Sequence, residues 1–433
     1  MDPLTVGCIG IGILILFLFS GIPIGVAMGA TGVAGMLLVA GPQAALGLLE
    51  RIPYDTTANY TISVVPLFIL MGSFCFRAGI SQDLYRAVYK WIGHFRGGLA
   101  MATVAACAGF AAVSGSSLAT AATMGTVALP EMKKYGYDDR LATGAVAAGG
   151  TMGILIPPSI IFILYGVITE QSIGKLFLAG FIPGVLEAVF YIITIHLWVR
   201  RNPATGPRGP KTALSEKLVS FKGVWIVLVL FVLVIGGIYF GIFSPTEAGG
   251  IGAFGAFLFA IGRGRLGWSN FFGSLFETGK TSAMIFVIVI GATLLGAFLA
   301  VTRVPYELAD MVAALPVNRY IILILIIMVY ILLGMIMDSM AMVLLTVPIF
   351  FPVITALGFD PIWFGVIIVR MTEIGQITPP VGINVFVIKG VVPDIPIGTI
   401  FKGIVPFLIA DICHVALLIA VPQISLFLPN LLK

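Results

Sequence analysis

Long apolar runs separated by short polar stretches make up most of this 433-residue sequence. An α-helix needs roughly 20 apolar residues to cross about 30 Å of hydrocarbon, and the runs do not alternate as membrane-spanning β-strands do. We therefore predict an all-α polytopic membrane protein. Runs of sufficient length begin at Leu4, Ile22, Thr61, Phe177, Val224 and Ser282.

Four other apolar stretches are interrupted. Stretches 99–135 and 320–357 carry small polar residues at their middle, SGSSLAT and GMIMDSM, which predicts two re-entrant hairpins. Stretches 138–170 and 360–390 contain paired prolines, and because proline removes a backbone donor and clashes with the preceding turn, each is predicted to be a broken span. Irregular backbone at membrane depth survives only where protein or a water-filled cavity covers it. We expect the four interruptions to converge near the midplane.

These interruptions belong to an internal repeat. Residues 129–159 resemble residues 351–381 without a gap, at a displacement of 222 residues (379 − 157 for the first proline of each pair). Nearer the N-terminus, FSGIPIG at 19 pairs with FSPTEAG at 243, a displacement of 224 (243 − 19). The chain is therefore predicted to consist of two copies of one ancestral unit.

The repeat assigns the same order of elements to both halves. The first repeat (1–199) is predicted to contain scaffold spans 4–78, an arm helix 80–95, the hairpin 99–135, the broken span 138–170 and a closing span 177–199. The second repeat (223–433) is predicted to contain scaffold spans 223–301, an arm helix 304–315, the hairpin 320–357, the broken span 360–390 and a closing span 397–425. A basic stretch, 200–222, joins them and is interpreted as a tether because it is rich in Pro and Gly.

The charges predict that the two repeats have opposite orientations. The loop EMKKYGYDDR of the first repeat is basic, whereas its counterpart VITALGFDPI carries no Lys or Arg. The arm helix 80–95 is amphipathic with a charged stripe of mixed sign, and its counterpart 304–315 carries Glu307 and Asp310 instead. Cytoplasmic loops are enriched in Lys and Arg, so the copies face opposite sides and the linker falls in the cytoplasm.

Composition narrows the class further. The sequence is 59% hydrophobic and 10% charged, with a mean hydropathy of +1.12. The net charge of +5 fits loops beside an anionic membrane face and does not require nucleic acid. Asp2 stands where a signal peptide would be basic, so residues 4–20 are expected to remain as a span. The scattered cysteines and histidines form no metal or catalytic motif, and we expect no enzyme activity.

The broken helices predict a site for a cation and an anion together. Carbonyl groups exposed at the C-terminal ends of half-helices suit Na⁺, and N–H groups at the N-terminal ends suit carboxylates. Asp338 at the second hairpin turn either ligates the cation or caps the helix that follows it. Ser114, Ser116 and Ser117 at the first turn have the same two interpretations, together with close helix packing.

Several polar residues near the breaks also have two interpretations. Arg370 and Glu373 lie three apart and can form a structural ion pair, or Arg370 can anchor a substrate carboxylate. The hydroxyls of Thr372 and Thr378 either line the site, which we favour, or satisfy the backbone. Glu187 and Asp411, in the closing spans, are expected to face partner helices or a loop. Glycines Gly149, Gly150 and Gly153 permit either approach to an ion or helix packing.

Taken together, the motifs SGSSLATAATMGTVALPEM, GGTMGILIPPS and EIGQITPPVGINVFV resemble, nearly end to end, the large membrane subunit of tripartite ATP-independent periplasmic (TRAP) transporters. The resemblance implies a Na⁺-driven importer of a small organic acid in the bacterial inner membrane. It also implies two partners, a small four-span membrane subunit and a periplasmic substrate-binding protein. The hairpins and broken spans would form a transport domain that moves like an elevator against the scaffold, linked to it by the arm helices.

The resemblance also implies two Na⁺ sites with the substrate between them. The first would involve Ser114, Ser116, Ser117, Gly150 and Gly153. The second would involve Asp338, Ser339, Thr372, Gly375 and Thr378. Candidate substrate contacts are Ser117, Thr151, Arg370, Gln376 and Asn384. The nearest alternative is a Na⁺-coupled anion symporter that binds free substrate without a binding protein; an intramembrane enzyme and a passive channel fit the sequence less well.

Overall fold

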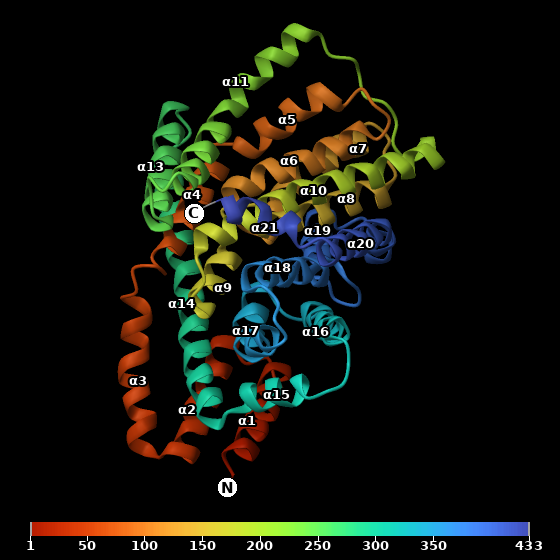
Figure 1. Ribbon diagram of the computed structural model, residues 1–433. Helices are drawn as coiled ribbons and strands as arrows, with labels where there is room; N and C mark the ends of the chain where they lie inside the picture. The colour runs from red at the N-terminus through yellow and green to blue at the C-terminus, as the bar shows by residue number, and fades with distance from the viewer. Residues whose placement is uncertain (1, 432–433) are drawn as a thin grey trace.

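The computed structural model describes residues 2–431, and within this range it contains helices and no strand (Figure 1). The first half contains α1 (Pro3–Phe19), α2 (Ile24–Ala40), α3 (Pro42–Thr57), α4 (Val64–Arg77), α5 (Ile80–Ile92), α6 (Gly98–Ser114), α7 (Ser117–Lys134), α8 (Asp139–Thr151), η1 (Met152–Ile154), α9 (Ile160–Thr169), α10 (Ile173–Arg201) and η2 (Pro203–Thr205). The second half contains α11 (Leu214–Phe231), η3 (Val232–Gly236), α12 (Gly237–Tyr239), α13 (Pro245–Gly262), α14 (Trp268–Thr302), α15 (Val304–Ala313), α16 (Arg319–Gly334), α17 (Ser339–Ala356), α18 (Pro361–Ile377), α19 (Ile383–Val391), α20 (Ile397–Ala420) and α21 (Gln423–Leu431).

The predicted all-α polytopic membrane fold is confirmed. Among residues 2–431, five helical segments are long and apolar enough to cross a membrane: α10, α11–α12, α14, α17 and α20. Counting the bent pair α4–α5 as one span raises the number to six. The shorter apolar helices include α6, α9 and α16, which belong to the hairpins and broken spans.

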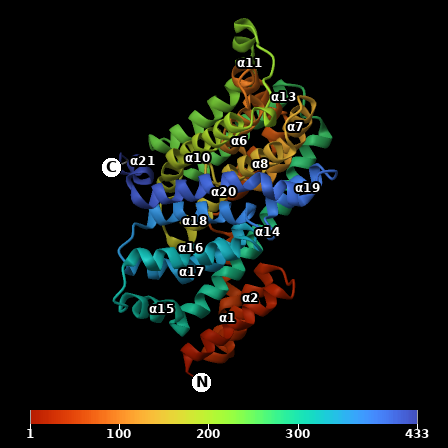
Figure 2. The same cartoon turned by 90° about the vertical axis from the view of Figure 1, so that its right-hand side faces the viewer.

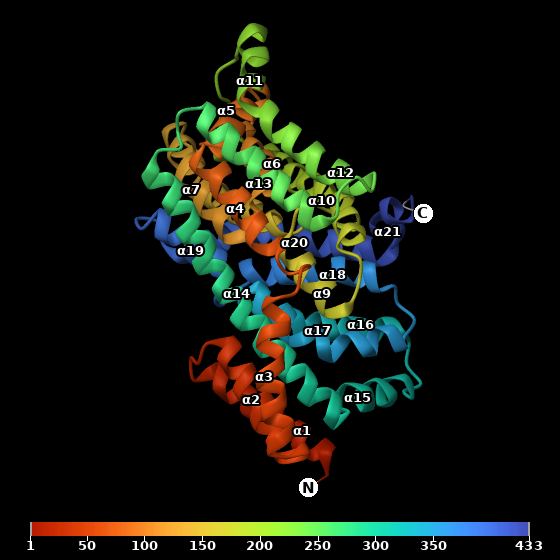
Figure 3. The same ribbon diagram turned by 90° about the vertical axis from the view of Figure 1, so that its left-hand side faces the viewer.

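The helices are stacked in layers. In Figure 2, α10, α20, α18 and the pair α16–α17 follow one another, with α1, α2 and α15 at one end and α11 and α13 at the other. The long helix α14 runs along the side of this stack, next to α2, α3 and α4 (Figure 3). One helix thus connects both ends of the molecule.

Contacts between the two halves come in reciprocal pairs. Helix α2 packs on α14, and its counterpart α13 packs on α4. Similarly, α9 packs on α17 while α19 packs on α7, and α8 packs on α20 while α18 packs on α10. Each of these contacts therefore has a counterpart in which the two halves exchange roles, as expected of two related units.

Small residues allow the closest of these crossings. At the contact of α2 with α14, a methyl group on Gly25 would lie 2.7 Å from the carbonyl oxygen of Val287, and one on Gly32 would lie 2.6 Å from the carbonyl carbon of Leu294. Gly291 approaches the Gly25 carbonyl oxygen in the same way. Membrane helices associate through this kind of small-residue packing because lipid provides little hydrophobic driving force.

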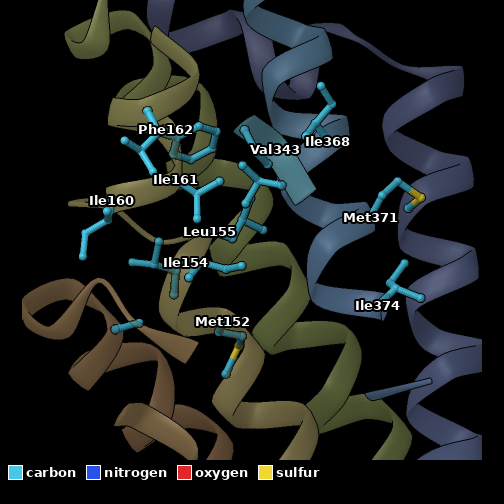
Figure 4. Packing of buried hydrophobic residues seen from close by; sticks show 14 of the residues in the cluster. Met152, Ile154, Leu155, Ile160, Ile161, Phe162, Val343, Ile368, Met371 and Ile374 are labelled. Carbon is cyan, nitrogen blue, oxygen red and sulfur yellow. The ribbon is translucent and has the colours of Figure 1, made fainter. Parts of the chain in front are cut away.

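An apolar core surrounds the first break. Figure 4 shows the buried side chains of Met152, Ile154 and Leu155 next to those that begin α9, with Val343 of α17 and the α18 residues Ile368, Met371 and Ile374 beside them. The irregular backbone between α8 and α9 is thus covered by protein, which is the condition for its survival at membrane depth.

Three details differ from the sequence-based prediction. The stretch 200–222 is not a tether throughout, because α10 extends to Arg201 and α11 already begins at Leu214. Helix α3 was not predicted; its Glu50, Arg51 and Asp55 interrupt the apolar pattern. Its counterpart is the beginning of α14, which starts at Trp268 rather than at Ser282.

Candidate transport site

The first hairpin turns sharply between α6 and α7. Gly115 adopts a left-handed conformation (φ 60°), and the Ser116 side chain accepts a hydrogen bond from the Ala119 amide as the N-cap of α7. Thr120 links both sides of the turn by hydrogen bonds. Its hydroxyl lies 2.8 Å from Ser114 Oγ and donates to the Ser116 carbonyl oxygen at 2.8 Å.

The first break lies directly against this turn. A methyl group on Gly153 would lie 2.5 Å from the Ser116 carbonyl oxygen, and one on Gly150 would lie 2.6 Å from Ala121 Cβ. The structure thus brings Ser116 and Gly153 together as predicted for the first site, while Gly150 packs one turn further along α7. These contacts also satisfy the helix-packing interpretation of the two glycines.

The second hairpin turn is held by Asp338. Its Oδ2 accepts a hydrogen bond from the Met340 amide at 3.1 Å, as the N-cap of α17. One of the two carboxylate oxygens of Asp338 therefore acts as a helix cap, as one of the two interpretations predicted. On the other side of this hairpin, Gly334 packs on Gly375 so closely that a methyl group on Gly375 would lie 2.5 Å from the Gly334 Cα.

One hydrogen bond joins the two repeats at the centre. Asn384 Nδ2, near the start of α19, donates to Ser117 Oγ at the start of α7 at 2.8 Å. Both side chains are buried, and the remaining Asn384 oxygen, Oδ1, has no protein partner. The second broken span and the first hairpin are thereby fixed to each other.

A cavity of about 710 Å³ lies between the two hairpin turns and the helices α2 and α14. This volume is within the range of small-molecule sites. The N-terminal ends of α7 and α17 both reach it, through Ser117 and Ser339. Gln376 is the lining residue of α18, and its amide oxygen and nitrogen are buried without a protein partner. The full lining is Pro23, Ile24, Gly25, Ser116, Ser117, Leu118, Ile154, Thr281, Ala283, Met284, Val287, Ile288, Asp338, Ser339, Met340, Ala341, Gln376 and Ile383.

Several predicted contacts lie outside this cavity. The hydroxyls of Thr372 and Thr378 donate to the carbonyl oxygens of Val369 at 2.7 Å and Ile374 at 2.6 Å. That of Thr151 likewise donates to Ala148, at 2.7 Å. For Thr372 and Thr378 the structure therefore supports the backbone interpretation rather than the lining that we favoured.

Arg370 is fully buried among three carboxyl groups. Its NH1 lies 2.7 Å from Glu187 Oε1 and 2.5 Å from Glu373 Oε2, and its NH2 lies 2.6 Å from Asp411 Oδ1. Arg370 and Glu373 thus form an ion pair, which is one of the two interpretations left open by the sequence, and Glu187 and Asp411 face a partner helix, α18. With its guanidinium surrounded in this way, Arg370 is better described as a structural residue than as a substrate anchor.

The scaffold side of the site is not among the residues predicted from the sequence. Gly25, Thr281 and Val287 line the cavity from α2 and α14. One signal was available: Gly25 ends the FSGIPIG motif whose recurrence revealed the repeat. Thr120 was also missed, although it stands four residues after Ser116 and so on the same face of α7.

Discontinuous helices whose ends meet at a shared cavity, built from two related halves, are the architecture of a membrane transporter. Residues 11–424 match the family described as "Tripartite ATP-independent periplasmic transporter, DctM component". The chain belongs to this family, the large permease subunits of TRAP transporters.

Individual relatives agree with this assignment. The chain is 37% identical to the C4-dicarboxylate TRAP transporter large permease protein DctM of Pseudomonas aeruginosa, covering 93% of both chains. It is 34% identical to the sialic acid TRAP transporter large permease protein SiaM of Vibrio cholerae, covering 96% of both. Among solved structures, it shares the fold of the YdaH transporter of Alcanivorax borkumensis, with a TM-score of 0.67 at 14% identity over 99% of both chains.

Proposed function

We propose that this chain is the membrane subunit through which a Na⁺ gradient drives the uptake of a small organic acid across the bacterial inner membrane. The observation that carries the proposal is the cavity lined jointly by both hairpin turns, Gln376 and the scaffold helices α2 and α14. The N-terminal ends of α7 and α17 at this cavity favour an anionic ligand. Carboxylates are the substrates named for the C4-dicarboxylate and sialic acid relatives.

Sodium is the proposed coupling ion. Ser116 and its carbonyl group beside Gly153 supply oxygen ligands at the first hairpin, and the Asp338 carboxylate supplies them at the second. Hard cations prefer oxygen ligands. Each Na⁺ that enters would contribute about 2.3 kcal/mol per 100 mV of membrane potential.

Two cavities in equivalent places support an elevator-type movement. A cavity of about 720 Å³ borders α14 at Thr293, Gly296, Ala297 and Ala300. A smaller one of about 280 Å³ borders α4 at Ile69, Gly72, Ser73 and Phe76, each 224 positions earlier (293 − 69, 296 − 72, 297 − 73 and 300 − 76). Two equivalent cavities of unequal size are expected in one asymmetric state of a protein built from related halves. If the larger cavity became the smaller one and the reverse, the site would be exposed alternately to the two sides of the membrane.

The family description implies two further components. We propose that a small four-span membrane subunit supports the scaffold and that a periplasmic substrate-binding protein delivers the acid. Selectivity among organic acids would then be shared between that protein and the cavity.

Uptake into proteoliposomes tests the proposal. The chain reconstituted with its small subunit and cognate binding protein should accumulate labelled succinate or N-acetylneuraminate when an inward Na⁺ gradient is applied, and not with an equal K⁺ gradient. Uptake of either acid by this chain alone, without Na⁺ or the binding protein, would contradict the proposal and favour a symporter that takes free substrate.

A further inference from the structure

A groove of about 560 Å³ lies between the arm helix α5 and the hairpin helix α7, which contact each other (Figure 1). It shares no lining residue with the transport cavity. Spacings of three and four residues place the lining residues on one face of each helix. Helix α5 contributes Gln82, Tyr85, Arg86, Tyr89 and Lys90, and α7 contributes Thr126, Val127, Pro130 and Glu131.

Opposite charges line the two walls of this groove without being paired with each other. Arg86 and Lys90 belong to the α5 wall, and Glu131 belongs to the α7 wall. Within residues 2–431, no salt bridge involves Arg86 or Glu131, while Lys90 Nζ lies 3.8 Å from Glu216 Oε2 of α11. The charges of Arg86 and Glu131 are therefore available to a ligand that carries both signs.

We propose that this groove binds a headgroup with a phosphate and a primary ammonium group, as in phosphatidylethanolamine. The guanidinium of Arg86 can donate two parallel hydrogen bonds to a phosphate, and Lys90 adds a second positive charge on the same wall. The Glu131 carboxylate can accept hydrogen bonds from the ammonium group. This inference depends neither on the proposed Na⁺ coupling nor on the elevator movement.

The position of the groove fits a headgroup at the membrane surface. Glu131 lies in the last turn of α7, and the exposed Lys133 and Lys134 follow it at the end of that helix. They belong to the basic loop that the charge pattern predicts to be cytoplasmic. Val127 lines the groove one turn before Glu131 and provides an apolar surface next to the charges. Basic pockets between helices on the cytoplasmic side are typical sites for lipid headgroups.

Glu131 distinguishes between the possible headgroups. Phosphatidylglycerol has the phosphate without a cation, so the Glu131 carboxylate would repel it. Phosphatidylcholine has a cation, but its methyl groups replace the N–H donors that a carboxylate accepts from. A metal cation would be repelled by Arg86 and Lys90. The ethanolamine headgroup satisfies both walls of the groove.

Native mass spectrometry of the delipidated chain in detergent tests the proposal. From an equimolar mixture of the three lipids with identical acyl chains, wild-type protein should retain phosphatidylethanolamine in preference to the other two. E131Q should lose the preference over phosphatidylglycerol, because the repelling carboxylate is gone. R86Q/K90Q should retain less of both lipids.

The control is K133Q/K134Q, which removes the same amount of charge from α7 outside the groove. All five substituted side chains are at least partly exposed, so these variants should fold. K133Q/K134Q should keep the wild-type preference. No preference in the wild type, its survival in E131Q, or its equal loss in K133Q/K134Q would overturn the proposal.

A second measurement uses only the wild-type chain and identifies the source of the headgroup. Glycerophosphoethanolamine, the headgroup without acyl chains, is added to protein that holds isotope-labelled phosphatidylethanolamine. Displacement by this compound but not by glycerophosphocholine would show that the groove also takes a free headgroup. Displacement by neither, with the lipid preference intact, would show that the ligand is a membrane lipid. Equal displacement by both compounds would overturn the proposal.

Discussion

Asn384 donates a hydrogen bond to Ser117 across the centre of the molecule, over 267 positions of sequence. It joins the start of α19 in the second repeat to the start of α7 in the first. The elevator movement that we propose would require such a connection, because the hairpins and broken spans would have to move together to keep the site intact.

The first prediction concerns this bond. N384A and S117A should each lower thermal stability, since a buried side-chain hydrogen bond contributes about 0.5–1.5 kcal/mol. A double-mutant cycle on the detergent-solubilised protein should show that the two losses are not additive. Additive losses would mean that the two residues act independently.

Asp338 provides a second prediction, with a matched control in the same chain. Asp338 and Asp360 both cap helices, α17 and α18, but only Asp338 lines the cavity. D338N and D360N should both keep nearly the stability of the wild type, because asparagine caps a helix about as well as aspartate does. Only D338N should abolish the stimulation of uptake by Na⁺.

If uptake by D338N and by D360N depended equally on Na⁺, Asp338 would act only as a helix cap. The comparison is informative because both substitutions keep the shape of the side chain and remove one negative charge. Stability and transport are therefore separated within one pair of variants.

A third prediction concerns Arg370. R370Q leaves three buried acids without their shared cation and should lower stability by about 3–5 kcal/mol, the usual cost of breaking a buried ion pair. R51Q removes a cation from an exposed pair with Asp55 and should change nothing measurable. Fluorescence-detected size exclusion after heating measures both.

Partial recovery in R370Q/E187Q/E373Q/D411N would show that the damage comes from uncompensated charge. If the fourfold variant were no more stable than R370Q, the loss would instead reflect packing of the long arginine side chain.

Close helix crossing gives a fourth prediction. A methyl group on Gly291 would collide with the Gly25 carbonyl oxygen, while Gly279 on the same helix α14 has open space around it. G291A should destabilise the protein by about 1–3 kcal/mol through overpacking. G279A should be neutral or slightly stabilising, because alanine favours helix. Similar melting curves for the two variants would contradict the packed geometry of α2 on α14.

These residues also show what the sequence could reveal. The polar turn motifs, the paired prolines and the 222-residue displacement predicted the hairpins, the breaks and their convergence, because those depend on local backbone chemistry repeated twice. The pairing of Ser116 with Gly153 was implied by the resemblance to TRAP subunits. Whether the hydroxyls of Thr372 and Thr378 donate to carbonyl oxygens of their own helix depends on side-chain rotamers, which the sequence pattern does not encode. The contact of Arg370 with Glu187 spans 183 positions and depends on how α10 packs against α18. Helix α3 was not predicted because its charged residues interrupt the apolar pattern.

The last prediction concerns Gln376, the side chain of α18 that reaches the cavity. Its amide is fully buried yet unpartnered, which is costly for a polar group unless a ligand completes its hydrogen bonds. Q376L keeps the size and removes the donors. Because a hydrogen bond to a charged group contributes about 1.5–3 kcal/mol, and about 1.4 kcal/mol corresponds to a tenfold change, the substrate concentration for half-maximal uptake should rise at least roughly tenfold. Q171L, in the loop after α9, removes an amide that bonds the Thr169 carbonyl outside this cavity and should leave that concentration unchanged. An unchanged value in Q376L would remove Gln376 from the substrate site.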